Sequence, residues 1–285
     1  MPVHALTIER VHRPSAAEFR RRYFHRNQPV IISGWLDAWP AMTRWTPEFF
    51  RDQLGCVEVD VEVLHPGEGT AAYAAGREQV RMSFAELCAR MASTGSGPLH
   101  YLGRCRILDV APELAGDLGS LAPYLRLPAA PARVTAKLTN GPVFWMGPAG
   151  SVTPLHFDSS PNLFVQIYGR KRWTMFAPDQ AALLHYPHRA FFDEVEYGRF
   201  PFMSPIDLDR PDLARFPRFR EARGTTFDIG PGEVLHVPAC YWHHVRTLEP
   251  SISLSYWRAT AITGGYLALY AVLQLRTALR RRLRR

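Results

Sequence analysis

The chain has 285 residues, of which 47% are hydrophobic and 21% charged, and its formal net charge is +8 at pH 7. This composition is ordinary for a soluble globular protein, and the length allows one large domain or two small ones. The positive charge favours acidic partners only weakly, because much of it lies at the extreme C-terminus.

The four cysteines, Cys56, Cys88, Cys105 and Cys240, form no C-x-x-C spacing. This pattern argues against a disulfide framework or a zinc site and favours a reducing compartment. The first thirty residues contain no apolar stretch of the kind found in secretory signals. We therefore expect a cytoplasmic protein.

The first half of the chain predicts a mixture of strands and helices. Residues 28–35 form a short strand, and residues 46–55 form a helix with Thr46 as N-cap and Pro47 at the first position. Strict alternation predicts a strand over residues 56–64. Ser83 begins a second capped helix over residues 83–93, and the Pro-rich residues 123–134 form a connection.

From Val134 onward the pattern becomes β. Residues 162–178 predict a hairpin of two short strands about a Tyr-Gly-Arg turn, and residues 251–257 form a final alternating strand. Between them lies a long irregular segment, residues 185–224, which is too long for a plain connector. We expect a mainly β fold, a barrel or double-sheet jelly roll, with flanking helices at both termini.

The domain prediction is one domain over residues 1–258, followed by a C-terminal helix with an Arg-rich tail over residues 259–285. Residues 259–275 carry no charge but include a Gly-Gly pair, so we expect a buried or dimer-forming helix and no membrane span.

His156 and Asp158 are two residues apart, so on a strand both side chains point to the same face. A third ligand is available from either His243 or His244, on the last long β element before the final strand. Two histidines and one carboxylate form the facial triad of non-haem Fe(II) oxygenases. This set leaves three positions open on the metal, two for a chelating oxo-acid and one for O₂.

An isolated H-x-D is weak, because a core histidine bonded to an aspartate has the same pattern. Lys171 is a second feature that strengthens the metal-site interpretation of the H-x-D pair. It shares a face with Trp173 by the period of two, and a lysine inside a small barrel must pair with an anion. The distal carboxylate of 2-oxoglutarate would serve, with the Thr153 hydroxyl as a nearby donor.

The segment from Phe144 to Trp257 resembles the JmjC-type, cupin-like 2-oxoglutarate oxygenases. It is similar in particular to their short hydroxylase members, the hypoxia-inducible-factor asparaginyl hydroxylase and the JmjC-only arginyl hydroxylase. The motifs that carry the resemblance are TPLHFDSSPNLFVQIYGRKRW, PIDLDRPDLARFPRF, GPGEVLHVPACYWHHVR and SISLSYW, joined by QPVIISGW and HYLGRCRILDVAPEL in the first half.

This resemblance implies a double-stranded β-helix core and a set of site residues. The metal ligands for Fe(II) would be His156, Asp158 and His243, because the family's ligand directly follows Tyr-Trp. The residues implied to hold or adjoin the 2-oxoglutarate cosubstrate are Lys171, Thr153, Asn162, Tyr101 and Trp257. Ser255 stands where the asparaginyl hydroxylase has an asparagine.

The expected activity is hydroxylation of an amino-acid side chain in a protein or peptide. A small-molecule tailoring hydroxylase and, less favoured, an N-methyl-lysine demethylase would use the same metal centre. A rival of another class is a binding module with a vestigial barrel. The six arginines between Arg276 and Arg285 could contact nucleic acid or an anionic surface, or could be a solvated helix end. The residues before this tail could form a homodimer.

Overall fold

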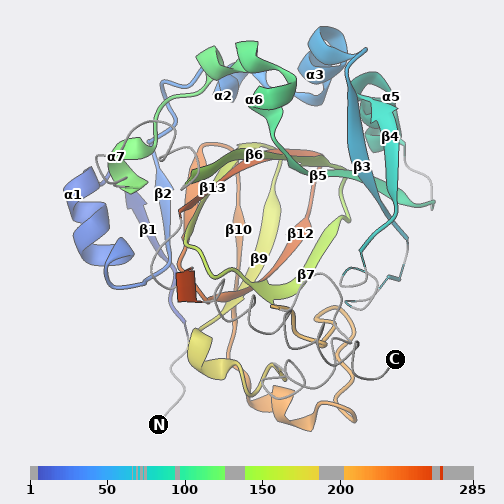
Figure 1. Cartoon of the computed structure of the whole chain (residues 1–285). Coiled ribbons are helices and arrows are strands. Elements are labelled where there is room, and N and C mark those ends of the chain that lie inside the picture. Colours follow the sequence, from blue (N-terminus) through green and yellow to red (C-terminus); the bar gives the residue numbers. More distant parts are fainter. Residues whose placement is uncertain are drawn as a thin grey trace, which may run out of the picture.

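The computed structural model describes residues 6–65, 67–68, 70, 73, 76–93, 97–125, 139–185, 202–258 and 264–265, with the side chains of residues 139–141 left out. Two sheets curve around a common interior (Figure 1). The larger sheet contains, in spatial order, β1 (Glu9–His12), β2 (Val30–Ser33), β11 (Glu233–Val237), β8 (Asn162–Tyr168), β13 (Ser251–Arg258), β6 (Thr139–Gly147), β5 (Leu99–Cys105), β3 (Glu58–Leu64) and β4 (Gln79–Ser83).

The smaller sheet has four strands in the order β10 (Thr225–Ile229), β9 (Lys171–Phe176), β12 (Trp242–Thr247) and β7 (Val152–Phe157). Apart from the parallel pair β1–β2, the paired strands of both sheets are antiparallel. Apart from β9 and β10, which pair with each other in the smaller sheet, successive strands from β6 to β13 alternate between the sheets, which is the arrangement of a jelly roll. The predicted double-stranded β core is confirmed.

Helices cover the outer face of the larger sheet. Helices α2 (Ala41–Arg44), α3 (Pro47–Leu54), α5 (Phe84–Ala92) and α6 (Ile107–Val110) lie over β6 and its neighbours, and α1 (Ala16–Phe19) and α7 (Ala122–Leu125) lie beside β1 and β2 (Figure 1). Short turns of π- or 3-10 helix occupy Arg20–Phe24, Pro112–Asp117, Pro178–Gln180 and Pro217–Glu221. The main hydrophobic core joins these helices to the sheet, so the helices close one side of the jelly roll.

The helix boundaries follow the local sequence signals. The Thr46 hydroxyl accepts a hydrogen bond from the Phe49 amide at 3.2 Å, and the Ser83 hydroxyl accepts one from the Glu86 amide at the same distance. Each bond satisfies an amide that has no partner within the first turn. Both predicted helices and both predicted caps are confirmed.

The predicted hairpin over residues 162–178 is wrong. β8 pairs with β11 and β13 in the larger sheet, whereas β9 pairs with β10 and β12 in the smaller one. The chain crosses between the sheets at Gly169, whose φ is +67° and where a Cβ would lie 2.0 Å from the Pro250 carbonyl oxygen. Local sequence shows a turn between two strands, but only the distant partners decide which sheet each strand joins.

Some predictions fall on residues that the structure does not describe. These are most of the 123–134 connection, residues 186–201 of the long irregular segment, and almost all of the C-terminal helix and Arg-rich tail. Within the described ranges, no helix has the length and apolarity needed to cross a membrane. The homodimer and the anionic contact of the tail stay predictions.

Candidate active site

Three polar side chains converge inside the jelly roll. His156 lies on β7 and His243 on β12, and the antiparallel register places these two residues directly opposite each other. Asp158 follows β7 immediately. One ligand atom from each of the three side chains lies within 4.8 Å of the other two. Neighbouring strands therefore bring together residues that are 87 positions apart in sequence, as the H-x-D spacing led us to expect.

Hydrogen bonds fix the orientation of both imidazole rings. The Nδ1 atom of His156 lies 2.8 Å from the Pro154 carbonyl oxygen, and that of His243 lies 3.0 Å from the Tyr241 carbonyl oxygen. A carbonyl only accepts, so each Nδ1 carries the proton and each Nε2 keeps its lone pair. Burial, together with the neighbouring His156, holds the pKa of His243 well below its usual value. His243 is therefore neutral at physiological pH, as a metal ligand must be.

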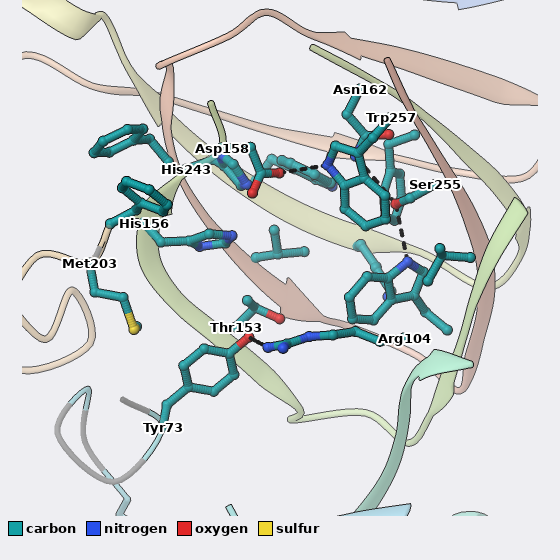
Figure 2. A pocket seen from close by; sticks show the side chains of 18 of the residues that line it. Tyr73, Arg104, Thr153, His156, Asp158, Asn162, Met203, His243, Ser255 and Trp257 are labelled. Atoms are coloured by element: carbon teal, nitrogen blue, oxygen red, sulfur yellow. Dashed lines mark hydrogen bonds between the residues drawn. The ribbon is translucent and has the colours of Figure 1, made fainter. Parts of the chain in front are cut away.

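Asp158 is positioned by two distant segments. Its side-chain Oδ2 accepts a hydrogen bond from the Trp257 indole N–H at 2.9 Å, and Trp257 lies on β13 of the opposite sheet. Its backbone carbonyl accepts a bond from the Cys240 amide at 2.7 Å, just before β12 begins. The carboxylate is thus held near the two imidazoles from both sheets (Figure 2).

Lys171 is the buried cation of the site. It is 1% exposed and lies at the start of β9, on the same inward face as Trp173. Its ammonium donates to the Tyr101 hydroxyl at 3.2 Å. No carboxylate within the described ranges forms an ion pair with Lys171, and burial lowers the pKa of this amine to about 7. A buried amine whose observed polar partner is a neutral hydroxyl is suited to receive an anion.

One cavity of about 380 Å³ contains all eight side chains singled out from the sequence. Thr153 and Asn162 line it together with the three converging residues and Lys171, Tyr101 and Trp257. Asn162 donates to the Ser255 hydroxyl at 3.2 Å and accepts from the Tyr256 amide at 3.1 Å. Ser255 also accepts from the Trp145 indole at 3.1 Å. Asn162 is therefore held by protein partners on β13.

The sequence reasoning missed a second group of residues that line the cavity: Tyr73, Arg104, Arg106, Trp145, Phe202 and Met203. Met203 forms an isolated β-bridge with His156, so the long irregular segment contributes to the site. Arg104 lies within a motif that carries the resemblance, but no periodicity marks it as inward-facing. It lies at a shift in strand register that a regular strand pattern does not predict.

His244 faces away from this cavity. It lines a separate hollow of about 630 Å³ on the other side of β12, and its Nε2 lies 4.0 Å from an Asp209 carboxylate oxygen. Consecutive residues of a strand point to opposite faces, so only His243 points toward His156.

Comparison with known proteins agrees with this architecture. A family model described as a cupin-like domain matches residues 16–263. Lysine-specific demethylase 8 of Xenopus tropicalis is 31% identical over 251 residues, which cover 88% of this chain and 52% of that protein. Bifunctional peptidase and (3S)-lysyl hydroxylase JMJD7 of Homo sapiens is 28% identical over 262 residues, covering 86% of this chain and 81% of that protein.

HSPB1-associated protein 1 of Rattus norvegicus is 41% identical over a shorter segment of 115 residues, which covers 40% of this chain and 23% of that protein. The chain spans about half the length of the frog demethylase that it resembles. Because the family model covers most of the sequence and the predicted jelly roll is present, this chain belongs to the JmjC-type, cupin-like domain family.

Proposed function

We propose that the chain is an Fe(II)- and 2-oxoglutarate-dependent oxygenase that hydroxylates an amino-acid side chain of a protein or peptide. The observation that carries this proposal is one cavity that holds both the His156–Asp158–His243 cluster and the buried amine of Lys171. The printed names of two relatives, a lysyl hydroxylase and a lysine-specific demethylase, support chemistry on protein side chains.

The donor set fits Fe(II). Two neutral imidazoles present unprotonated Nε2 atoms, and the Asp158 carboxylate supplies one negative charge against the charge of the ion. The Trp257 indole holds this carboxylate in place through the oxygen that it contacts. Iron and 2-oxoglutarate, when bound, supply the activation of O₂ that oxidation of an unactivated C–H bond requires.

Lys171 and its neighbours fit the far carboxylate of 2-oxoglutarate. An incoming anion would raise the pKa of the amine and keep it charged, which removes the cost of burying it alone. The Tyr101 hydroxyl already contacts the amine, and Thr153 lines the same cavity as a second hydroxyl donor. Asn162, held against Ser255 and Tyr256, lines the same cavity.

Apolar rings keep the site dry. Phe164 and Trp173 are 5% and 2% exposed and line the cavity near Lys171, and Trp173 stacks on His243 with 5.5 Å between ring centroids. Exclusion of water strengthens the attraction between an amine and a carboxylate. It also shields the reacting carbon from side reactions.

The test uses protein loaded with Fe(II), 2-oxoglutarate and O₂, and a pooled peptide library. Wild type should form succinate and add one oxygen atom to selected peptides, in equal amounts. A His156→Ala variant should do neither, and Arg51→Gln on the outer helix α3 serves as the control. Absence of 2-oxoglutarate turnover in well-folded, iron-loaded wild type would refute the proposal.

The same assay separates the other activities on this centre. Loss of a methyl group with release of formaldehyde would indicate demethylation, and oxygen added only to small molecules would indicate a tailoring hydroxylase.

Cytoplasmic location is proposed from the cysteine pattern and the lack of an apolar stretch in the first thirty residues, and a homodimer through residues 259–275 is proposed from their apolar character.

A further inference from the structure

The charged groups that line the cavity are mostly cationic. Besides Lys171 and the His156–Asp158–His243 cluster, the described lining residues include Arg104 and Arg106, each of which carries a guanidinium group. The only carboxylate among the described lining residues is that of Asp158, which belongs to the metal cluster. Glu62 on the neighbouring strand β3 is paired with Arg77 at 3.4 Å and is not among those lining residues.

Arg104, which lines the cavity, lies at a backbone irregularity. The pairing of β5 with β6 shifts register between Leu102 and Cys105, which marks a bulge. Arg104 lies inside this bulge with a φ of +56°, a left-handed conformation that an arginine rarely adopts. Bulges next to active sites re-aim side chains, and strained residues persist where the surrounding structure holds them. Arg104 therefore lies at an irregular point of β5, beside the proposed metal site.

Arg104 and Lys171 contact different tyrosines of the cavity. Its guanidinium donates to the Tyr73 hydroxyl at 2.9 Å, and Figure 2 shows this contact on the same side of the cavity as Thr153, facing His156. Lys171 instead contacts Tyr101 and lies under the ring of Phe164. Arg104 and Arg106 are both exposed, but Arg104 also reaches the Tyr73 hydroxyl, which lines the cavity, so Arg104 is the candidate for contact with a bound ligand.

We propose that Arg104 binds a carboxylate on the substrate, and that the residue to be hydroxylated is therefore acidic. This inference rests on the proposed oxygenase function and names its substrate class. A guanidinium stays charged at all physiological pH values and matches a carboxylate through two parallel N–H bonds. A lysine or arginine of the substrate would meet a like charge here and would be disfavoured.

The matched variants keep the backbone and change only the charge. Arg104→Asn removes the cation while using a residue that tolerates the left-handed conformation. Arg104→Lys keeps the cation, Arg104→Glu reverses it, and Arg51→Glu reverses a remote exposed charge as the control. Thermal melts identify any variant that does not fold.

The experiment is anaerobic affinity selection from a seven-residue peptide library with degenerate flanks, using protein loaded with Fe(II) and 2-oxoglutarate. Wild type and Arg51→Glu should enrich peptides with central Asp or Glu about tenfold over those with Lys or Arg. Arg104→Asn should lose this preference, Arg104→Lys should keep part of it, and Arg104→Glu should reverse it. A residue that merely supports Tyr73 would not produce reversal.

Three results would overturn the inference: enrichment of basic peptides by wild type, no charge preference, or an unchanged preference in Arg104→Asn. A parallel selection from a pool of small carboxylic acids distinguishes the source of the carboxylate, and enrichment there alone would overturn the peptide assignment. Peptide-independent conversion of 2-oxoglutarate to succinate, measured separately in air, tests the oxygenase function. Failure of the substrate inference is thereby distinguished from failure of the proposed activity.

Discussion

The indole N–H of Trp257 donates a hydrogen bond of 2.9 Å to the carboxylate of Asp158, a residue 99 positions earlier in the chain. Trp257 lies on β13 of the larger sheet, and Asp158 follows β7 of the smaller one. This bond therefore links the two sheets at the proposed metal site. The other carboxylate oxygen of Asp158, Oδ1, is not held by this bond and faces the histidines.

We expect Trp257→Phe to weaken metal binding, because the carboxylate loses the donor that orients it while the aromatic packing stays. Partners that orient metal ligands typically change affinity about 10- to 100-fold when removed. Titration calorimetry with Mn(II) measures the effect. The control is Trp145→Phe, which removes an indole donor to Ser255 from the same cavity. Equal Mn(II) affinities in both variants would contradict the role of Trp257.

Replacement of His156, Asp158 or His243 by Ala should abolish stoichiometric metal binding and coupled turnover. Each loss removes one of three donors that lie within 4.8 Å of one another. His244→Gln is the control, because His244 follows a ligand in sequence but lines the opposite hollow. Full metal binding in the Ala variants, or a loss in His244→Gln as large as in His243→Ala, would refute the ligand assignment.

The parts of the structure that the sequence predicts well depend on local chemistry. Caps at Thr46 and Ser83 act within one helical turn, so the residues that decide them are adjacent in sequence. The H-x-D pair is similar, because strand alternation alone puts both side chains on one face. The inward direction of Lys171 follows from the strand face that it shares with Trp173.

The parts that it predicts poorly depend on distant partners. Whether β8 and β9 pair with each other or join opposite sheets is decided by β11, β12 and β13, which come later in the chain. Arg104 lies where the pairing of β5 with β6 shifts register, and no local pattern in the sequence shows that shift. The Trp257–Asp158 bond likewise requires knowledge of which strands face each other.

Gly147→Ala should disturb the proposed 2-oxoglutarate site through Tyr101, although Gly147 is not among the described residues that line the cavity. A Cβ at Gly147 would lie 2.2 Å from a ring carbon of Tyr101, so the ring, whose hydroxyl contacts Lys171, must shift. We expect a higher Michaelis constant for 2-oxoglutarate and a loss of about 1–3 kcal/mol in the free energy of unfolding. Gly116→Ala is the control, because a Cβ there meets no heavy atom within 4 Å. An unchanged 2-oxoglutarate requirement in Gly147→Ala would show that Tyr101 does not support Lys171.

Lys171→Met should stabilise the protein when no 2-oxoglutarate is present. Burial lowers the pKa of this amine from 10.5 to about 7. Below pH 7 the amine is charged in both the folded and unfolded states, and the folded state carries the full cost of burying it. Between pH 7 and 10.5 only the unfolded state stays protonated, so the stability of wild type rises with pH by up to about 1.4 kcal/mol per pH unit from this group.

The advantage of Lys171→Met over wild type should therefore be greatest at pH 6 and shrink toward pH 9. Thermal melts at both values measure it, with Arg172→Met on the outward face of β9 as the control. Addition of Mn(II) and 2-oxoglutarate should raise the melting temperature of wild type, because the dicarboxylate binds only the folded state, and should affect the variant much less. A pH-independent difference between the two proteins, or equal stabilisation by 2-oxoglutarate, would mean that Lys171 is not the buried cation that receives the cosubstrate.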